Sequence, residues 1–217
     1  MEERYKITAD LISKSPTDIF GLKFLPSLEP HYGDDQDLPY SGWCGWPEIS
    51  ECNHSTCESV LRDLGDRCGA ILEIGVNRSG PENLSQIFMG QKPDHCIYLG
   101  VDLVDKIYLD DPSKNIHTLC CNSHEQDLIR NRLAELGVAR LDLLMIDGWH
   151  SVHTTINDWR YADLLSDHGI VLVHDVNTHP GDIALCEAVD EAVFEKTMLC
   201  PGADYGIAMF RRRQPTS

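Results

Sequence analysis

The sequence has few basic residues for its length of 217. It carries 18 lysines and arginines against 35 acidic residues, which gives a formal net charge of −17. Because nucleic-acid affinity depends largely on basic side chains that neutralise phosphates, this charge disfavours a DNA or RNA partner. The one basic cluster, Arg211–Arg213, favours a solvated tail rather than a binding patch. The acidic balance therefore directs attention to small-molecule ligands.

Long apolar runs are also missing. The N-terminal stretch MEERYKITAD lacks the apolar core of a signal peptide. Runs such as Ile170–Val173 are far too short to cross a bilayer. The nine cysteines are an odd number and are spread along the chain, which favours reduced thiols over a disulfide framework. We expect a cytoplasmic protein with no membrane partner. The oligomeric state stays open, a homo-oligomer included.

Internal repeats and low-complexity tracts are absent, and regular structure is predicted from residue 55 onward. Near-continuous apolar runs alternate with helical patterns, which is typical of a buried parallel sheet. We predict an α/β, Rossmann-like doubly wound fold: a mostly parallel sheet with an antiparallel C-terminal strand and helices on both faces. Expected strands are Ala70–Ile74, Cys96–Val101, Ile116–Cys121, Leu141–Ile146, Gly169–Val173 and Tyr205–Phe210, with a weak one near Met198–Leu199. Expected helices are Ser55–Asp66, 81–89, 125–136, 152–166 and Pro180–Lys196.

Residues 1–54 are predicted to form an accessory segment, and residues 55–217 the main domain. Trp43 and Trp46 lie in a stretch rich in glycine and proline. They would either wall a substrate site, as part of a lid, or anchor the segment to the core, and the second reading is slightly favoured. A capping box of Ser55 and Glu58 is expected to open the first helix.

A cluster of potential zinc ligands lies near this boundary. Cys44, Cys52, His54 and Cys57 fall within fourteen positions, and thiolates and imidazoles are the ligands of structural zinc. The spacing is irregular and has no C-x-x-C pair, and Cys57 falls inside the expected helix. A zinc site is therefore the less favoured reading.

Polar residues follow every one of the first five expected strands. Ligands of open parallel sheets bind outside the carboxyl ends of the strands. Because these ends meet at one edge, the polar residues should gather there. The set comprises Glu73, Gly75, Asn77 and Gly80 after the first strand, Asp102, then Asn122 and Ser123, then Asp147 and His150, and finally His174 and Asp175.

The turn around Gly75 indicates the class of cofactor. Glycine allows positive φ and close approach of the backbone to a ligand, but the G-x-G-x-x-G pattern that holds a pyrophosphate is absent. Asp102 is placed to accept hydrogen bonds from ribose hydroxyls. The acid at Glu73 suits a cofactor with an amino group and a sulfonium, which points to S-adenosyl-L-methionine rather than a nicotinamide.

With these motifs the chain resembles the class I S-adenosylmethionine-dependent methyltransferases. It is most similar to the small-molecule O-methyltransferase branch that has an E-I-G motif, here Glu73–Gly75, and an I-D-G-x-H motif, here Ile146–His150. A strand that ends in H-D, here Gly169–Asp175, is the third signature. The resemblance implies that Glu73, Gly75, Asn77 and Gly80 line the methionine half of the cofactor, that Asp102 holds the ribose, that Asn122 and Ser123 lie beside the adenine, and that Asp147, Gly148 and Trp149 close over the reacting methyl. Asn122 and Ser123 could equally be a turn that caps the next helix.

The expected reaction is in-line methyl transfer to a hydroxyl of a small molecule, such as a sugar or a natural-product scaffold. The hydroxyl proton would pass to a base or be made acidic by a metal. His150 is the preferred base, His174 the second choice, and Asp147 lies beside them. Related enzymes hold magnesium with acids after the fourth and fifth strands, here Asp147 and Asp175, but Val176 replaces the second member of the usual pair. Magnesium therefore stays open. A non-catalytic binding protein and a nicotinamide-dependent oxidoreductase are the alternatives.

Overall fold

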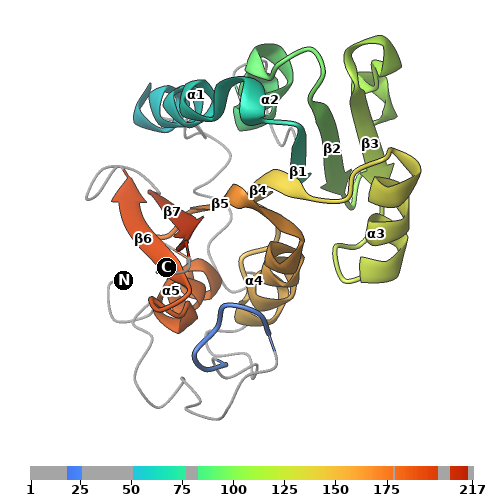
Figure 1. Cartoon of the computed structure of the whole chain (residues 1–217). Helices are drawn as coiled ribbons and strands as arrows, with labels where there is room; N and C mark the ends of the chain where they lie inside the picture. Colours follow the sequence, from blue (N-terminus) through green and yellow to red (C-terminus); the bar gives the residue numbers. More distant parts are fainter. Residues whose placement is uncertain (1–18, 26–50, 77–82, 178, 200–205, 215–217) are drawn as a thin grey trace.

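A computed structural model describes residues 19–25, 51–76, 83–177, 179–199 and 206–214. Figure 1 shows a seven-stranded sheet with the order β3-β2-β1-β4-β5-β7-β6. Strands β1 to β5 are parallel, whereas β7 runs antiparallel to both β5 and β6. The predicted fold class is confirmed. The strands are β1 (Ala70–Ile74), β2 (Ile97–Asp102), β3 (Ile116–Cys120), β4 (Leu141–Ile146), β5 (Leu165–His174), β6 (Phe194–Leu199) and β7 (Ile207–Arg212); the helices are α1 (Glu51–Leu64), α2 (Leu84–Gln91), α3 (Gln126–Glu135), α4 (Val152–Trp159) and α5 (Pro180–Ala188).

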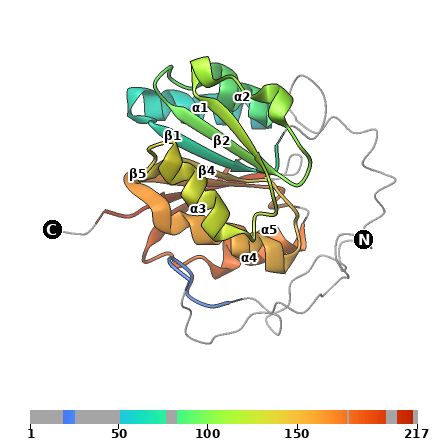
Figure 2. The ribbon, with the colours of Figure 1, turned by 90° about the vertical axis from the view of Figure 1, so that its right-hand side faces the viewer.

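Helices cover both faces of the sheet, α1 and α2 on one and α3, α4 and α5 on the other (Figure 2). Along β4, Leu143 and Met145 belong to the core under α1 and α2, while Leu144 and Ile146 belong to the opposite core. Because both faces are buried, all residues of β4 except Asp142 are apolar. This is the physical reason why the central strands appear in the sequence as near-continuous apolar runs.

Three helix boundaries differ from those that the sequence predicted. Helix α1 begins at Glu51, so Ser55 lies inside the helix and the predicted capping box is wrong. Helix α2 begins at Leu84 rather than near Pro81, and Asn83 caps it by accepting a hydrogen bond from the Gln86 amide at 3.0 Å. Helix α4 ends at Trp159 and a 3₁₀ helix follows, so β5 begins at Leu165, earlier than predicted.

The largest error concerns the helix expected to run to Lys196. Helix α5 ends at Ala188, and residues Phe194–Leu199 form β6, paired antiparallel with β7. The expected weak strand near Met198 is the end of this longer strand. Phe194 is fully buried and its ring packs edge-on against Trp159. Pairing with β7, which the local periodicity does not show, makes this segment a strand.

Of the predicted accessory segment, the structure describes residues 51–54, which begin α1, and the stretch 19–25. The Phe20 carbonyl accepts a hydrogen bond from the Trp159 indole at 2.9 Å, and the Lys23 amide donates to the Ala188 carbonyl at 2.9 Å. This stretch therefore lies at the C-terminal ends of α4 and α5, away from the carboxyl ends of the parallel strands. Trp43, Trp46 and the remainder of the predicted lid lie outside the described residues, so the lid stays a prediction.

Candidate functional site

The turn after β1 packs directly on the loop after β4. Gly75 has φ +86°, and a Cβ there would lie 2.0 Å from the Asp147 carbonyl oxygen. Its amide donates to the Val101 carbonyl at 2.9 Å, and the Asp147 amide donates to the Ile74 carbonyl at 2.9 Å. Glycine is thus required by the close approach of protein backbone. Gly75 joins the ends of β1, β2 and β4 at one edge of the sheet, where the predicted site lies.

Asp102, at the end of β2, holds this edge together through both carboxylate oxygens. Oδ2 accepts a hydrogen bond from the Val76 amide at 2.9 Å, and Oδ1 accepts one from the Val104 amide at 2.7 Å. The Lys106 ammonium lies 4.0 Å away. A carboxylate oxygen can accept more than one hydrogen bond. Asp102 therefore keeps the acceptor capacity that its predicted ribose role requires.

Glu73 makes its described contacts inside the protein. The side chain is 1% exposed and accepts hydrogen bonds from the Ser85 hydroxyl, at 2.9 Å, and from the Tyr98 hydroxyl. Burial raises the pKa of this carboxyl to about 8, although both hydrogen bonds act in the opposite direction. Glu73 thus ties β1 to β2 and α2, and its role beside the methionine half of a cofactor stays a prediction.

Asn122 and Ser123, after β3, form a turn. The Asn122 side-chain oxygen accepts a hydrogen bond from the His124 amide at 2.9 Å, and the Ser123 carbonyl accepts one from the Tyr161 hydroxyl at 2.6 Å. The pair therefore forms a turn but does not cap α3, whose N-cap is Glu125, and its contact with an adenine stays a prediction. A Cβ on Gly148 would lie 3.2 Å from Ile74, while Trp149 is 38% exposed at the same edge.

Some predicted residues lie outside the described part of the chain. These are Asn77 and Gly80 of the cofactor set and Cys44 of the zinc set, and the side chains of Cys52 and His54 are not described either. Cys57 is fully buried in α1, and burial raises the pKa of its thiol far above the usual value. A zinc site at this cluster stays a prediction.

The ends of β4 and β5 and the start of α5 bring together three histidines and three aspartates. The His150 ring contacts Asp182 through Nδ1 at 2.9 Å and Asp175 through Nε2 at 3.1 Å. The His174 Nδ1 lies 3.1 Å from both the Asp147 and the Asp175 Oδ1 atoms. His179 completes the group: its ring stacks on that of His150 with centroids 4.1 Å apart. We call these six residues the His/Asp cluster.

The sequence predicted four members of this cluster and missed His179 and Asp182. Both belong to the start of α5, where Asp182 was assigned only to the helix start. The spacing Asp175-x-x-x-His179 was the available signal, because the His179 amide donates to the Asp175 carbonyl at 3.0 Å. Asp175 has φ +59°, a sparsely populated conformation that places its carboxylate between two imidazoles.

Gly181 positions α5 against the loop that carries His150. Its amide donates to the His150 carbonyl at 3.0 Å, and a Cβ at this position would lie 2.3 Å from the same oxygen. Only glycine permits this approach without displacing the loop. The start of α5 and the end of β4 are therefore locked together in the His/Asp cluster.

The charges within the cluster bear on its chemistry. Burial alone would lower the pKa of His150, but the carboxylates of Asp182 and Asp175 outweigh burial and raise it to about 9. For His174, burial is likewise outweighed by Asp175 and Asp147, and its pKa lies well above the ordinary value. The neighbouring carboxylates thus favour the protonated form of both imidazoles, which is opposite to the form that a general base needs. The predicted base roles of His150 and His174 stay predictions.

Magnesium fits this group of residues poorly. It prefers six oxygen ligands in near-ideal octahedral geometry. Here the two predicted ligands, Asp147 and Asp175, each have a carboxylate oxygen 3.1 Å from the Nδ1 atom of His174, so a histidine lies between them. Val176, next to Asp175, is buried in the apolar core and supplies no oxygen from its side chain. We therefore derive no reaction step through magnesium, and magnesium binding by Asp147 and Asp175 stays a prediction.

Comparison with known proteins gave similarity at the level of structure only. No family model matches the sequence, and no curated protein matches it. The MycE methyltransferase from the mycinamycin biosynthetic pathway, in complex with Mg, SAH and mycinamycin VI, superposes with a TM-score of 0.54 at 15% identity, over 73% of this chain and 49% of that one. The chain thus spans about half the length of the MycE chains that it matches.

Two further structures match over most of both chains. The calicheamicin methyltransferase CalS11 has a TM-score of 0.54 at 13% identity, over 82% of this chain and 84% of that one. A methyltransferase from Geobacter sulfurreducens has a TM-score of 0.54 at 11% identity, over 80% and 84%. No helix in the described part of the chain has the length and apolar character to span a membrane. The chain thus has the Rossmann-like fold of solved S-adenosylmethionine-dependent methyltransferases.

Proposed function

We propose that this chain is an S-adenosylmethionine-dependent methyltransferase that methylates a hydroxyl of a small molecule in the cytoplasm. One observation carries the proposal: the Gly75 turn, Asp102 and the loop from Asp147 to Trp149 meet at the carboxyl ends of β1, β2 and β4. These three strands are neighbours in a sheet with the order β3-β2-β1-β4-β5-β7-β6. Polar groups at the carboxyl ends of β1, β2 and β4 are what a nucleoside-bearing cofactor needs.

Small hydroxylated acceptors are favoured by two further facts. The net charge of −17 opposes binding of nucleic acid. The superposed structures include one with bound mycinamycin VI and one of a calicheamicin methyltransferase, although a putative rRNA methylase from Clostridium thermocellum also has this fold. We propose a sugar or natural-product hydroxyl as the acceptor, and RNA is the competing substrate class.

The methyl group of a sulfonium is already an activated electrophile, so the protein must mainly align the acceptor oxygen with the C–S bond. Removal of the hydroxyl proton is proposed to take place in the His/Asp cluster. His150 is the first candidate base, since Asp182 orients its ring through Nδ1, and His174, which contacts Asp147, is the second. The neighbouring carboxylates raise the pKa of both imidazoles and so disfavour the neutral form that a base needs. A non-catalytic cofactor-binding protein is therefore the second candidate function.

Calorimetric titration with S-adenosylhomocysteine tests the cofactor. We expect binding by the wild-type chain, and we expect Asp102→Ala to weaken it at least tenfold while far-ultraviolet circular dichroism stays unchanged. Absence of binding, or binding of NADH instead, would contradict the proposal. Glu135→Gln, on an exposed part of α3, is the matched control and should bind like the wild type.

Transfer of a radiolabelled methyl group to a panel of hydroxylated small molecules and to total RNA tests the acceptor. Label on a small molecule that His150→Gln abolishes would support the small-molecule assignment and a role of His150 in the transfer. Label on RNA alone would refute the small-molecule assignment. Tight cofactor binding with no acceptor would favour the non-catalytic alternative.

A further inference from the structure

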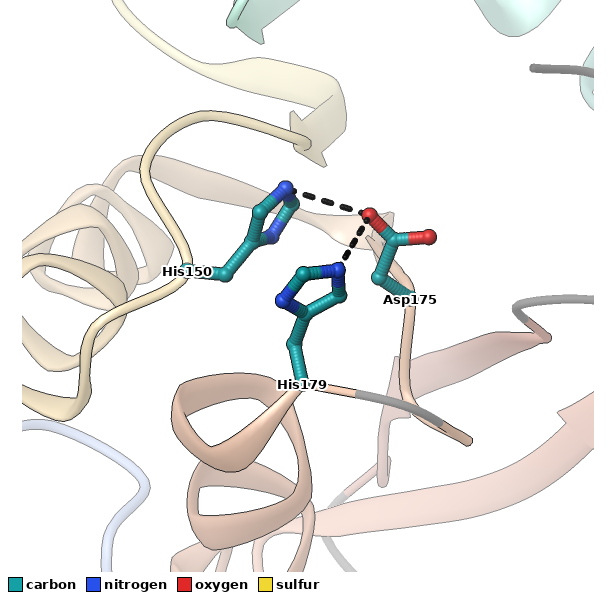
Figure 3. A group of neighbouring side chains, drawn as sticks. All are labelled: His150, Asp175 and His179. Atoms are coloured by element: carbon teal, nitrogen blue, oxygen red, sulfur yellow. Dashed lines mark ion pairs between the residues drawn. The ribbon is translucent and has the colours of Figure 1, made fainter. Parts of the chain in front are cut away.

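Three residues of the His/Asp cluster form an arrangement that goes beyond the single base of the proposed methyl transfer. Figure 3 shows the imidazoles of His150 and His179 side by side, both directed at the carboxylate of Asp175. The Asp175 Oδ2 lies 3.1 Å from the His150 Nε2 and 3.7 Å from the His179 Nε2. All three side chains are more than nine-tenths buried, at 4%, 4% and 1% exposed for His150, Asp175 and His179.

The two separations from Asp175 lie near those of ligands that share one ion. With bond lengths of about 2.1 Å, two ligands lie roughly 3.0 Å apart in an octahedron and roughly 3.4 Å apart in a tetrahedron. One potential ligand atom from each residue lies within 4.8 Å of the other two. The three atoms come from the loop after β4, the end of β5 and the start of α5, so the fold converges on them from separate segments.

The surroundings of His150 also resemble those of a metal ligand. A ligating histidine usually donates its other ring N–H to a carboxylate, which fixes the ring and its tautomer. The His150 Nδ1 has such a partner in the fully buried Asp182, at 2.9 Å. The His150 backbone is held as well, because its carbonyl accepts a hydrogen bond from Gly181 at the start of α5.

We propose that His150, Asp175 and His179 bind a divalent first-row transition metal ion such as Zn²⁺, Co²⁺ or Fe²⁺. Two imidazoles and one carboxylate are a donor set that these ions prefer and that magnesium does not. A dication also balances the negative charge of the buried carboxylates of Asp175 and Asp182. The site differs from the predicted magnesium site in its nitrogen donors and in His179 and Asp182. As a ligand through Nε2, His150 would leave the activation of an acceptor hydroxyl to the ion.

The experiment titrates Co²⁺ into the metal-stripped full-length chain, without a polyhistidine tag and without cofactor or acceptor. We expect visible d–d absorption at one equivalent, displacement of Co²⁺ by Zn²⁺, and no displacement by Mg²⁺. We expect His179→Gln and His150→Gln each to weaken Co²⁺ binding by at least about tenfold, and Asp182→Asn to weaken it by about tenfold to 100-fold. His153→Gln is the matched control: this exposed histidine lies on the neighbouring helix, its ring 5.0 Å from that of His124.

Three outcomes would overturn the proposal: no d–d absorption, spectra unchanged in both His179→Gln and His150→Gln, or absorption lost in His153→Gln, which would place the ion at the His124 and His153 pair. If a variant does not fold, X-ray absorption of the Zn²⁺-loaded wild type decides instead. We expect the scattering of two imidazole ligands, and a coordination shell of oxygen atoms alone would refute the site. Because cofactor binding is measured without metal and metal binding without cofactor, failure of one proposal leaves the other intact.

Discussion

Replacement of Glu73 by glutamine tests the electrostatics of the predicted cofactor edge. Glutamine has the shape of the protonated carboxyl. Its one amide oxygen can accept a hydrogen bond from Ser85 or from Tyr98, and its NH2 group can donate to the other hydroxyl. Burial raises the pKa of Glu73 from 4.5 to about 8. At neutral pH the folded chain therefore holds a proton at Glu73 that the unfolded chain has released.

The sign of the effect follows from the bound protons. Between pH 4.5 and pH 8 the native state binds one proton more than the unfolded state at this residue. The free energy of unfolding therefore falls as pH rises, by at most about 1.4 kcal/mol per pH unit from this one group. Across the whole interval the loss reaches roughly 4 to 5 kcal/mol as an upper bound. Glutamine, which does not titrate, removes this contribution.

Urea unfolding followed by circular dichroism, from pH 5 to pH 8.5, measures the difference between Glu73→Gln and the wild type. We expect the difference to shift steadily in favour of the variant as pH rises, with most of the change complete near pH 8. A difference that does not depend on pH would mean that Glu73 is ionised in the fold, and would refute the reasoning. Glu191→Gln, which removes an exposed carboxylate that is 64% accessible, controls for the loss of a charge.

The remaining predictions concern three glycines and the proposed ribose contact of Asp102. Gly75→Ala should destabilise the chain by roughly 2 to 5 kcal/mol in urea unfolding, from positive φ together with the clash on the Asp147 carbonyl; a loss below 1 kcal/mol would contradict the packing described. Gly181→Ala should push α5 away from His150 and weaken Co²⁺ binding at least tenfold. Gly90→Ala, in α2 with open space around it, should instead raise the free energy of unfolding by about 0.5 to 1 kcal/mol in urea unfolding. Asp102→Asn should weaken S-adenosylhomocysteine binding in calorimetry less than Asp102→Ala does, because one oxygen acceptor remains; equal losses would contradict a ribose contact.

Local patterns in the sequence determined most of the fold. The bounds of β1 and β4 were predicted to the residue, because a strand buried on both faces is a near-continuous apolar run. Glu73 interrupts the run in β1 and Asp142 the run in β4, and the runs end before Gly75 and Asp147. The gathering of Gly75, Asp102, Asp147 and Asp175 at one edge followed as well, since the carboxyl ends of parallel strands meet there.

Tertiary structure decided what periodicity and spacing do not encode. Strand β6 exists because β7 offers it a partner and Phe194 fills a space beside Trp159, whereas the local sequence suggested a continued helix. His179 and Asp182 join His150 only because α5 docks on the loop after β4 through Gly181. The protonation of His150 follows from two carboxylates that approach it from β5 and α5. Contacts between separate elements set these features, and they place His150 as a buried imidazole between two carboxylates.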